Sequence, residues 1–212
     1  ETYDSEGRIL SSVDAMGRTT TFAYSDGTAA TATIEGTSIP LFEGTLIRVT
    51  DFKGRSMSFG YNASGYLVRM TDPTGSNFLY QFDIAKGNLV AVTYPDERTR
   101  TYHYNEPAHN GGTSQPFALT GITDENGARF ATYQYDSSGR VTRSEHAAGA
   151  DGHTFTYGAS GVSSYVDPLG TTRTTGHSVV LGVAKRATTT QPCPGCGPSV
   201  TNTRAFDANG NL

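Results

Sequence analysis

The chain has 212 residues with a formal net charge of −4, so it lacks the basic surface through which proteins bind nucleic acid or anionic membranes. Hydrophobic residues make up 35% and charged residues 17%, and 25 glycines and 9 prolines favour short strands and frequent turns over helices. Twelve tyrosines and ten phenylalanines supply enough large apolar surface to argue against disorder, and no apolar run approaches the ~20 residues of a transmembrane helix.

The first residues predict a β-hairpin between two polar turns. Asp4–Gly7 and Asp14–Gly17 share the pattern Asp-x-x-Gly. Aspartate at the first turn position can accept a hydrogen bond from the N–H two residues on, and glycine at the fourth tolerates positive φ. The segment 18–24 that follows reads as a strand. Phe22 and Tyr24 lie on one face of it, because side chains alternate with period two.

This aromatic pair recurs along the chain and sets a repeat. The second members of successive pairs are 37, 21, 22, 31 and 22 residues apart, so the period is about 21–22 residues and the two long steps contain insertions. Each period predicts two antiparallel strands and two turns. The pairs are Phe22/Tyr24, Phe59/Tyr61, Tyr80/Phe82, Tyr102/Tyr104, Tyr133/Tyr135 and Phe155/Tyr157.

The pattern continues with interruptions to the end of the chain. Insertions are expected near 28–45, 106–117 and 188–203, and a Tyr-Pro-Asp segment at 94–96 replaces one turn. No aromatic pair occurs near residue 179, and residues 188–199 read as a loop around the proline- and glycine-rich segment 192–198. The residues that define the repeat are Tyr3, Asp4, Gly7, Arg8, Phe22, Tyr24, Phe59, Tyr61, Gly65, Tyr80, Phe82, Gly87, Tyr102, Tyr104, Tyr133, Tyr135, Asp136, Gly139, Arg140, Phe155 and Tyr157.

The predicted fold class is all-β, because no helical periodicity of useful length is visible. We expect a single repeat array over residues 1–212, built as an antiparallel meander of hairpins. Periodicity alone also allows a β-solenoid or a β-propeller, in which two periods would supply the ~40 residues of a four-stranded blade. The chain opens and stops inside a repeat, so we expect a piece of a longer array whose edge strands favour self-association.

Two motifs carry a family resemblance. Tyr-Asp-x-x-Gly-Arg occurs at 3–8 and 135–140, and Asp-Pro-x-Gly occurs at 72–75 and 167–170. With these motifs nearly the whole chain resembles the YD-repeat, or Rhs-repeat, family. The resemblance implies a long antiparallel sheet that spirals into a hollow shell, which in bacterial members encloses a toxic C-terminal domain. It also implies a secreted or cell-surface parent whose partners are further repeats, an enclosed toxin or other cargo, and delivery-apparatus proteins.

Many bacterial members of that family carry an aspartyl self-cleavage site built around Pro-x(4)-Asp-Pro-x-Gly-Leu. Asp72-Pro73 and Asp167-Pro168 both lack the leucine after the glycine and the proline upstream. We therefore interpret both as ordinary repeat turns and do not assign the activity to them.

Cys193-Pro194-Gly195-Cys196 is the one local motif whose side chains could bind a metal or carry out redox chemistry. Cysteines at this spacing can supply two zinc thiolates, but a structural zinc site needs four ligands, and no second cysteine pair exists. The spacing also matches a redox dithiol, without the βαβ context typical of one. We expect a tight turn without metal or other cofactor, and Cys193 and Cys196 are the candidates for a zinc- or thiol-dependent site.

Other residues have simpler structural interpretations. The histidines are scattered, and none lies in a recognisable nucleophile motif. The oxygen-rich stretch 207–211 lacks the remainder of a calcium-binding loop. Aromatic rows can stack sugars, but their constant place in the period favours packing between neighbouring strands. The arginines after the turn glycines are expected to pair with turn aspartates of adjacent repeats; they are Arg8, Arg18, Arg55 and Arg140.

The residues and the resemblance together predict a structural wall segment with no enzymatic activity. It would belong to a shell that encloses or displays a C-terminal toxin or other cargo. The alternative is a cell-surface adhesion or glycan-binding module that uses exposed aromatics and the insertions at 28–45 and 106–117. The weaker alternative is a zinc- or thiol-dependent site at Cys193 and Cys196.

Overall fold

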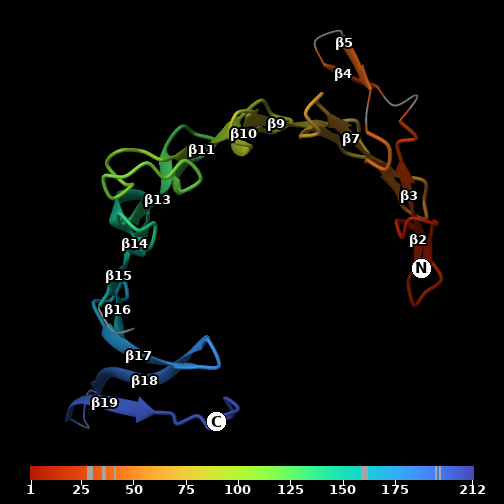
Figure 1. Ribbon diagram of the computed structural model, residues 1–212. Coiled ribbons are helices and arrows are strands. Elements are labelled where there is room, and N and C mark those ends of the chain that lie inside the picture. The colour runs from red at the N-terminus through yellow and green to blue at the C-terminus, as the bar shows by residue number, and fades with distance from the viewer. Residues whose placement is uncertain (28–30, 35–36, 41, 159–161, 194, 196) are drawn as a thin grey trace. The chain divides into compact units, whose positions relative to one another are not determined.

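The computed structural model is all-β (Figure 1) and describes the chain except residues 28–30, 35–36, 41, 159–161, 194 and 196. One turn of 3₁₀-helix, η1 (Ala147–Gly149), is the only helical segment among the residues described. The strands are β1 (Thr2–Tyr3), β2 (Ile9–Val13), β3 (Thr19–Tyr24), β4 (Thr31–Ile34), β5 (Thr37–Pro40), β6 (Leu46–Thr50), β7 (Ser56–Tyr61), β8 (Leu67–Thr71), β9 (Asn77–Asp83), β10 (Asn88–Thr93), β11 (Thr99–Tyr104), β12 (Leu119–Thr123), β13 (Arg129–Tyr135), β14 (Val141–His146), β15 (His153–Tyr157), β16 (Val162–Val166), β17 (Thr172–Val180), β18 (Val183–Cys193) and β19 (Gly197–Thr203).

Antiparallel pairing in chain order organises these strands. Seventeen strands belong to one sheet, and β4 and β5 form a separate two-stranded one. Strand β3 pairs with β6 because the β4–β5 hairpin intervenes. A propeller blade ends its ladder after four strands, whereas β6 to β10 already form an unbroken run of five. The predicted all-β antiparallel meander is therefore confirmed, and the propeller is not observed in the part described.

Contacts divide the chain into two compact units. Unit 1 comprises Glu1–Thr101 with Glu125–Gly127, and unit 2 comprises Tyr102–Asp124 with Ala128–Leu212. Each unit holds its own ladder of consecutive strands, β1 to β10 in unit 1 and β12 to β19 in unit 2. The hairpin β17–β18 turns through Leu181 and Gly182 with φ of 51° and 76°. Positive φ at both positions is the requirement of a type I′ turn, which suits the right-handed twist of the flanking strands.

The turn chemistry expected from the sequence is present. Asp136 Oδ1 accepts hydrogen bonds from the N–H groups of Ser138 (2.9 Å) and Arg140 (3.0 Å), and Gly139 has φ of 78°. The carboxylate thus satisfies two turn N–H groups, and glycine takes a φ that other residues avoid. The turn from Tyr94 to Arg98 keeps the same backbone hydrogen bonds although Glu97, with φ of 66°, stands in the glycine position.

A β-bulge follows the turn in several repeats, and the repeat pattern did not predict it. The ladder skips one residue opposite Tyr24, Tyr61 and Tyr135, which pair with Leu46, Leu67 and Val141. An extra residue on one strand bends it and increases the local right-handed twist. Each such repeat therefore carries its own twist-inducing element beside the second aromatic of its pair.

Few of the residues that the structure describes are buried. The buried hydrophobic side chains are Ala91, Val92 and Ala131, and the buried polar ones are Ser25, Asn110 and Thr120. Along β9 the exposure alternates, with Phe78, Tyr80 and Phe82 less exposed than the residues between them. Stability therefore comes from backbone ladders and half-buried side chains on adjacent strands.

The expectation of a loop at 188–199 is wrong. Strands β18 and β19 run through this segment, and Thr188, Thr189 and Thr190 pair with Thr203, Asn202 and Thr201. Threonine is β-branched and fits a pleated strand, so a ladder forms here without an aromatic pair. The insertion at 28–45 contains the β4–β5 hairpin, and parts of it lie outside the described residues.

Candidate functional site

The turn arginines form ion pairs inside their own turns. Arg140 Nε lies 2.7 Å from Asp136 Oδ2, and Arg8 Nε lies 2.6 Å from Asp4 Oδ2. The expected pairing with aspartates of adjacent repeats is therefore wrong. Because the two turn N–H groups hold Oδ1, Oδ2 faces the side chain four residues on. The same pairing joins Arg18 to Asp14 and Arg55 to Asp51.

These contacts favour the ionised carboxylates. The pKa of Asp4 lies below its ordinary value, first because the Arg8 guanidinium donates to it. The pKa of Asp136 is lowered first by the Arg140 backbone N–H. Ion pairs at the surface contribute little to stability, so the arrangement mainly fixes the geometry of each turn.

In three repeats the second residue of the aromatic pair is a tyrosine that reaches back to the strand before it. Its hydroxyl donates to the carbonyl of that strand's first residue and so closes the open end of the hairpin. We call this contact the tyrosine clamp. Burial raises the pKa of Tyr61 and Tyr135, which keeps both hydroxyls protonated donors at neutral pH. The clamps, each 2.8 Å long, join Tyr61 to Leu46, Tyr135 to Leu119 and Tyr157 to Val141.

The turn arginines also cover the rings of the following hairpin. The Arg140 guanidinium carbon lies 4.6 Å from the centre of the Tyr157 ring, a cation–π contact. Where Phe82 replaces the tyrosine, Tyr66 stacks on it with ring centres 4.9 Å apart. Successive aromatic pairs lie two strands apart, about 10 Å, so a ring reaches the intervening strand and not the next pair.

Removing a clamp hydroxyl should lower the free energy of unfolding by about 1 kcal/mol. We expect this loss for Tyr135→Phe, because the ring keeps its packing while the Leu119 carbonyl loses its donor. Tyr133→Phe is the matched control, since the Tyr133 hydroxyl has no hydrogen-bond partner among the residues described. Urea unfolding followed by circular dichroism measures both. Equal losses for the two variants would contradict the clamp.

The insertion at 106–117 begins with a partly buried ion-pair network. Arg129 donates to Glu106 through two nitrogens, with Nη1–Oε1 at 3.1 Å and Nη2–Oε2 at 2.7 Å. Thr120, which is 0% exposed, donates to Oε2 at 2.7 Å. These contacts lower the pKa of Glu106 to about 2, the Arg129 guanidinium being the main cause. Such bidentate pairs are the strong form of arginine–carboxylate contact.

The rest of the insertion packs on the turn of the next repeat, and we call residues 106–117 the docked loop. Gln115 Nε2 donates to the Asp136 carbonyl at 2.7 Å, and the Tyr135 N–H donates to the His109 carbonyl at 2.9 Å. A Cβ on Gly111 would lie 2.3 Å from the backbone carbonyl carbon of Asp136. The docked loop is therefore fitted closely against the turn that begins at Asp136.

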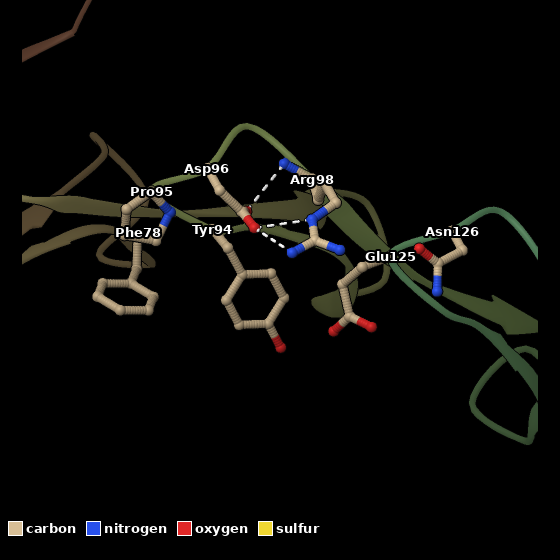
Figure 2. A pocket seen from close by; sticks show the side chains of 7 residues that line it. All are labelled: Phe78, Tyr94, Pro95, Asp96, Arg98, Glu125 and Asn126. Atoms are coloured by element: carbon tan, nitrogen blue, oxygen red, sulfur yellow. Dashed lines mark hydrogen bonds and ion pairs between the residues drawn. The ribbon is translucent and has the colours of Figure 1, made fainter.

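A hollow of about 480 Å³ in unit 1 accompanies the unusual Tyr94–Arg98 turn (Figure 2). Figure 2 shows the Tyr94 ring between Phe78 and the Glu125 carboxylate. The Phe78 and Tyr94 rings meet edge to face with centres 6.1 Å apart. The lining residues are Phe78, Tyr94, Pro95, Asp96, Arg98, Glu125 and Asn126.

The charged groups that line this hollow form ion pairs with neighbouring side chains. Arg98 Nε lies 2.7 Å from Asp96 Oδ2, and Glu125 Oε1 lies 2.9 Å from an Arg100 nitrogen. The pKa of Glu125 is lowered first by its own backbone N–H, and further by Arg100 and Tyr94. These ion pairs stabilise the turn. The feature that distinguishes this hollow from an ordinary turn is the pair of aromatic rings in its lining, Phe78 and Tyr94.

The cysteine motif lies at the end of β18. Cys193 is disulfide-bonded, and Pro194 and Cys196 lie outside the described residues. A zinc ligand is a thiolate, so the zinc- or thiol-dependent site remains a prediction for the reduced protein. Within the described ranges, no group of three or more His, Cys, Asp or Glu side chains is placed to hold a metal ion.

Two of the five histidines bond to hydroxyl groups of neighbouring strands. His103 Nε2 lies 2.7 Å from Thr123 Oγ1, and His153 Nδ1 lies 2.7 Å from the Tyr165 hydroxyl. Both contacts are those of side chains on adjacent strands of the sheet. No helix among the described residues has the length and hydropathy needed to span a membrane.

Known proteins share the repeat. A model of the RHS Repeat family matches residues 3–28 and 118–151. The double-stranded DNA deaminase toxin A of Burkholderia cenocepacia (strain H111) is 27% identical to this chain over 134 residues. That match covers 49% of this chain and 9% of the toxin. The chain thus corresponds to a small part of its relative.

Solved structures share the fold. The crystal structure of TcdB2-TccC3 superposes with a TM-score of 0.53 at 15% identity, covering 100% of this chain and 12% of that one. The form without the hypervariable C-terminal region gives 0.52 at 13% identity, covering 97% and 12%. The Photorhabdus luminescens Tc holotoxin pore gives 0.50 at 15% identity, covering 93% and 11%. Asp-x-x-Gly-Arg turns lie inside both segments that the family model matches, so residues 3–28 and 118–151 carry the YD repeat, or RHS repeat.

Proposed function

We propose that the chain is a non-catalytic wall segment of an RHS-repeat shell that encloses or displays a C-terminal toxin or other cargo. The carrying observation is the recurrence of one construction: a polar turn at one end of a hairpin and a tyrosine clamp at the other. A catalytic site occurs once in a protein, whereas a wall is built by using one joint repeatedly.

The proposal is also supported by the kinds of protein to which this chain is similar. The curated relative is a double-stranded DNA deaminase toxin, and one structural neighbour is a Tc holotoxin pore. For this chain we propose further repeats and an enclosed toxin as partners, delivery-apparatus proteins as transient ones, and a secreted or cell-surface parent. The deaminase activity of the relative is not assigned to these residues, because the match covers 9% of that toxin.

Protease protection tests the enclosure. The full-length parent and its C-terminal domain expressed alone are digested under the same conditions, and the surviving C-terminal domain is quantified. We expect the domain to survive in the parent and to be degraded when alone. Glu106→Gln, which weakens the wall within these residues, should accelerate cleavage in the parent. Equal digestion rates for the parent and the isolated domain would contradict the enclosing role.

Recognition of surface glycans is a second candidate, and the hollow beside Tyr94 is the observation that favours it. Flat ring faces beside carboxylate and amide groups suit the apolar and hydroxylated faces of a sugar. A glycan array probed with the protein and with Tyr94→Ala measures this. Binding that Tyr94→Ala removes and Tyr133→Ala retains would support the role, and no binding to any glycan would reject it.

A further inference from the structure

Two arginines of unit 2 meet in one small hollow. Arg186, on β18, and Arg204, just after β19, both line a space of about 180 Å³. Figure 1 shows β18 and β19 side by side near the C-terminus, and their ladder places Thr189 opposite Asn202. No acidic residue is among the lining residues described, which are Arg186, Ala187, Thr188, Thr189, Asn202 and Arg204.

These arginines differ from most others in the chain. The turn arginines each lie within 2.8 Å of a carboxylate oxygen, and so does Arg98 in the hollow of Figure 2. Among the described residues, neither Arg186 nor Arg204 forms an ion pair. Both guanidinium groups thus keep their donors and their charge available to a ligand.

A β-bulge accounts for their meeting. The ladder pairs His177 with Arg186 and Gly176 with Thr188, so Ala187 is an extra residue on β18. In a regular strand Arg186 would face away from Thr189, because three positions separate them. A bulge re-aims a side chain by setting two residues against one. Arg186 is thereby brought to the face of Arg204, whose N–H donates to the Ala187 carbonyl at 2.7 Å.

The donors and charge define the ligand class. The side chains of the lining residues include two guanidinium forks, the Asn202 amide and the Thr189 hydroxyl, and the arginines contribute two positive charges. Guanidinium forks match tetrahedral oxyanions in both geometry and charge. The volume of about 180 Å³ equals several waters at ~30 Å³ each, which is room for a group of five heavy atoms.

We propose that this hollow, the arginine pocket, binds the phosphate or sulfate group of a small ligand. The neighbouring cation Lys185 is engaged elsewhere, since its ammonium binds the Gly210 carbonyl and lies 5.3 Å from the Phe206 ring. His177 faces Arg186 across the ladder. The inference does not rest on the shell role, because the pocket belongs to one hairpin pair and not to the repeated joint.

Titration of the protein with inorganic phosphate, followed by NMR of backbone amides and arginine side-chain Nε–H groups, tests the pocket. Chloride is exchanged for phosphate at constant ionic strength, so that screening stays fixed. We expect saturable shifts confined to Arg186, Arg204 and the residues between them in the ladder. Arg186→Gln and Arg204→Gln should each weaken binding roughly tenfold, the loss expected for one charged hydrogen-bonding group.

Arg48→Gln is the matched control, because Arg48 on β6 is exposed and likewise has no ion pair among the described residues. Its affinity for phosphate should equal that of the unaltered protein. Arg204→Lys keeps the charge without the fork and should bind with intermediate affinity. A parallel titration with inorganic sulfate distinguishes a phosphoryl from a sulfuryl ligand, because the anion that binds with the higher affinity identifies the ligand group. Linear, unsaturable shifts, or equal weakening by Arg48→Gln and Arg204→Gln, would overturn the proposal.

Discussion

Gly111→Ala is expected to destabilise unit 2 by about 3 kcal/mol, one of the two largest effects we predict. The added Cβ would lie 2.3 Å from the Asp136 carbonyl carbon and 2.5 Å from the Ser137 nitrogen, so backbone on one side must move. The φ of 64° adds the usual cost of a side chain in the left-handed region. The docked loop should then separate from the turn at Asp136. Urea unfolding and amide hydrogen exchange at Tyr135, whose N–H bonds the loop, measure the change.

Gly112→Ala separates the effect of steric overlap from the effect of positive φ. Gly112 has φ of 75°, but nothing lies within 4 Å of the position its Cβ would take. This variant should therefore lose only about 1 kcal/mol, the cost of the left-handed backbone. Faster exchange at Tyr135 in Gly111→Ala alone would locate the damage at the docked loop. If both variants lost the same stability, close packing of the loop on the turn would be refuted.

Glu106→Gln should lower the free energy of unfolding at neutral pH by about 2 kcal/mol, a figure discounted because the Glu106 side chain is 33% exposed. The substitution keeps the size of the side chain but leaves the Arg129 charge without its carboxylate. The bond from Thr120, which is fully buried, would also lose its charged acceptor. Thermal or urea unfolding measures the loss. Glu6→Gln, which removes a surface ion pair with Arg8, should change stability little.

The same pair predicts a pH dependence with a definite sign. The folded-state pKa of Glu106 is about 2, against an ordinary value of 4.5. A lowered pKa means that the ionised form is the stabilising one, so the contribution is complete above pH 4.5 and declines as the pH falls toward 2. The stability difference between the unaltered protein and Glu106→Gln should shrink through this window. A difference that stays constant from pH 7 to pH 2 would contradict the assignment.

The elements that the sequence predicted correctly are those encoded within a few residues. An Asp-x-x-Gly turn needs only its own carboxylate and its own glycine, as Asp136 and Gly139 show. Side-chain exposure also alternates with period two along β9, from Asn77 to Phe82. Such features depend on local stereochemistry, which a single sequence contains in full.

Features that depend on register were missed. Residues 188–193 and 197–203 form strands without an aromatic marker, because threonine suits a ladder only once a partner strand is present. The bulges opposite Tyr61 and Tyr135 come from the match between two strands and not from either strand alone. The Glu106–Arg129 pair joins residues 23 positions apart across an insertion. In the sequence, the only indication of this ion pair was a glutamate at the start of the insertion.

The pairing of strands in chain order has a consequence for how the protein is made. The tyrosine clamps join residues only 15 or 16 positions apart, so a hairpin is complete soon after its last residue leaves the ribosome. Synthesis at roughly 5–20 residues per second delivers one repeat in seconds, while a hairpin forms within about 10 μs. Each new strand can therefore pair with the edge strand of a sheet that has already folded. Because each strand pairs with the one before it, contact order stays low however long the array becomes.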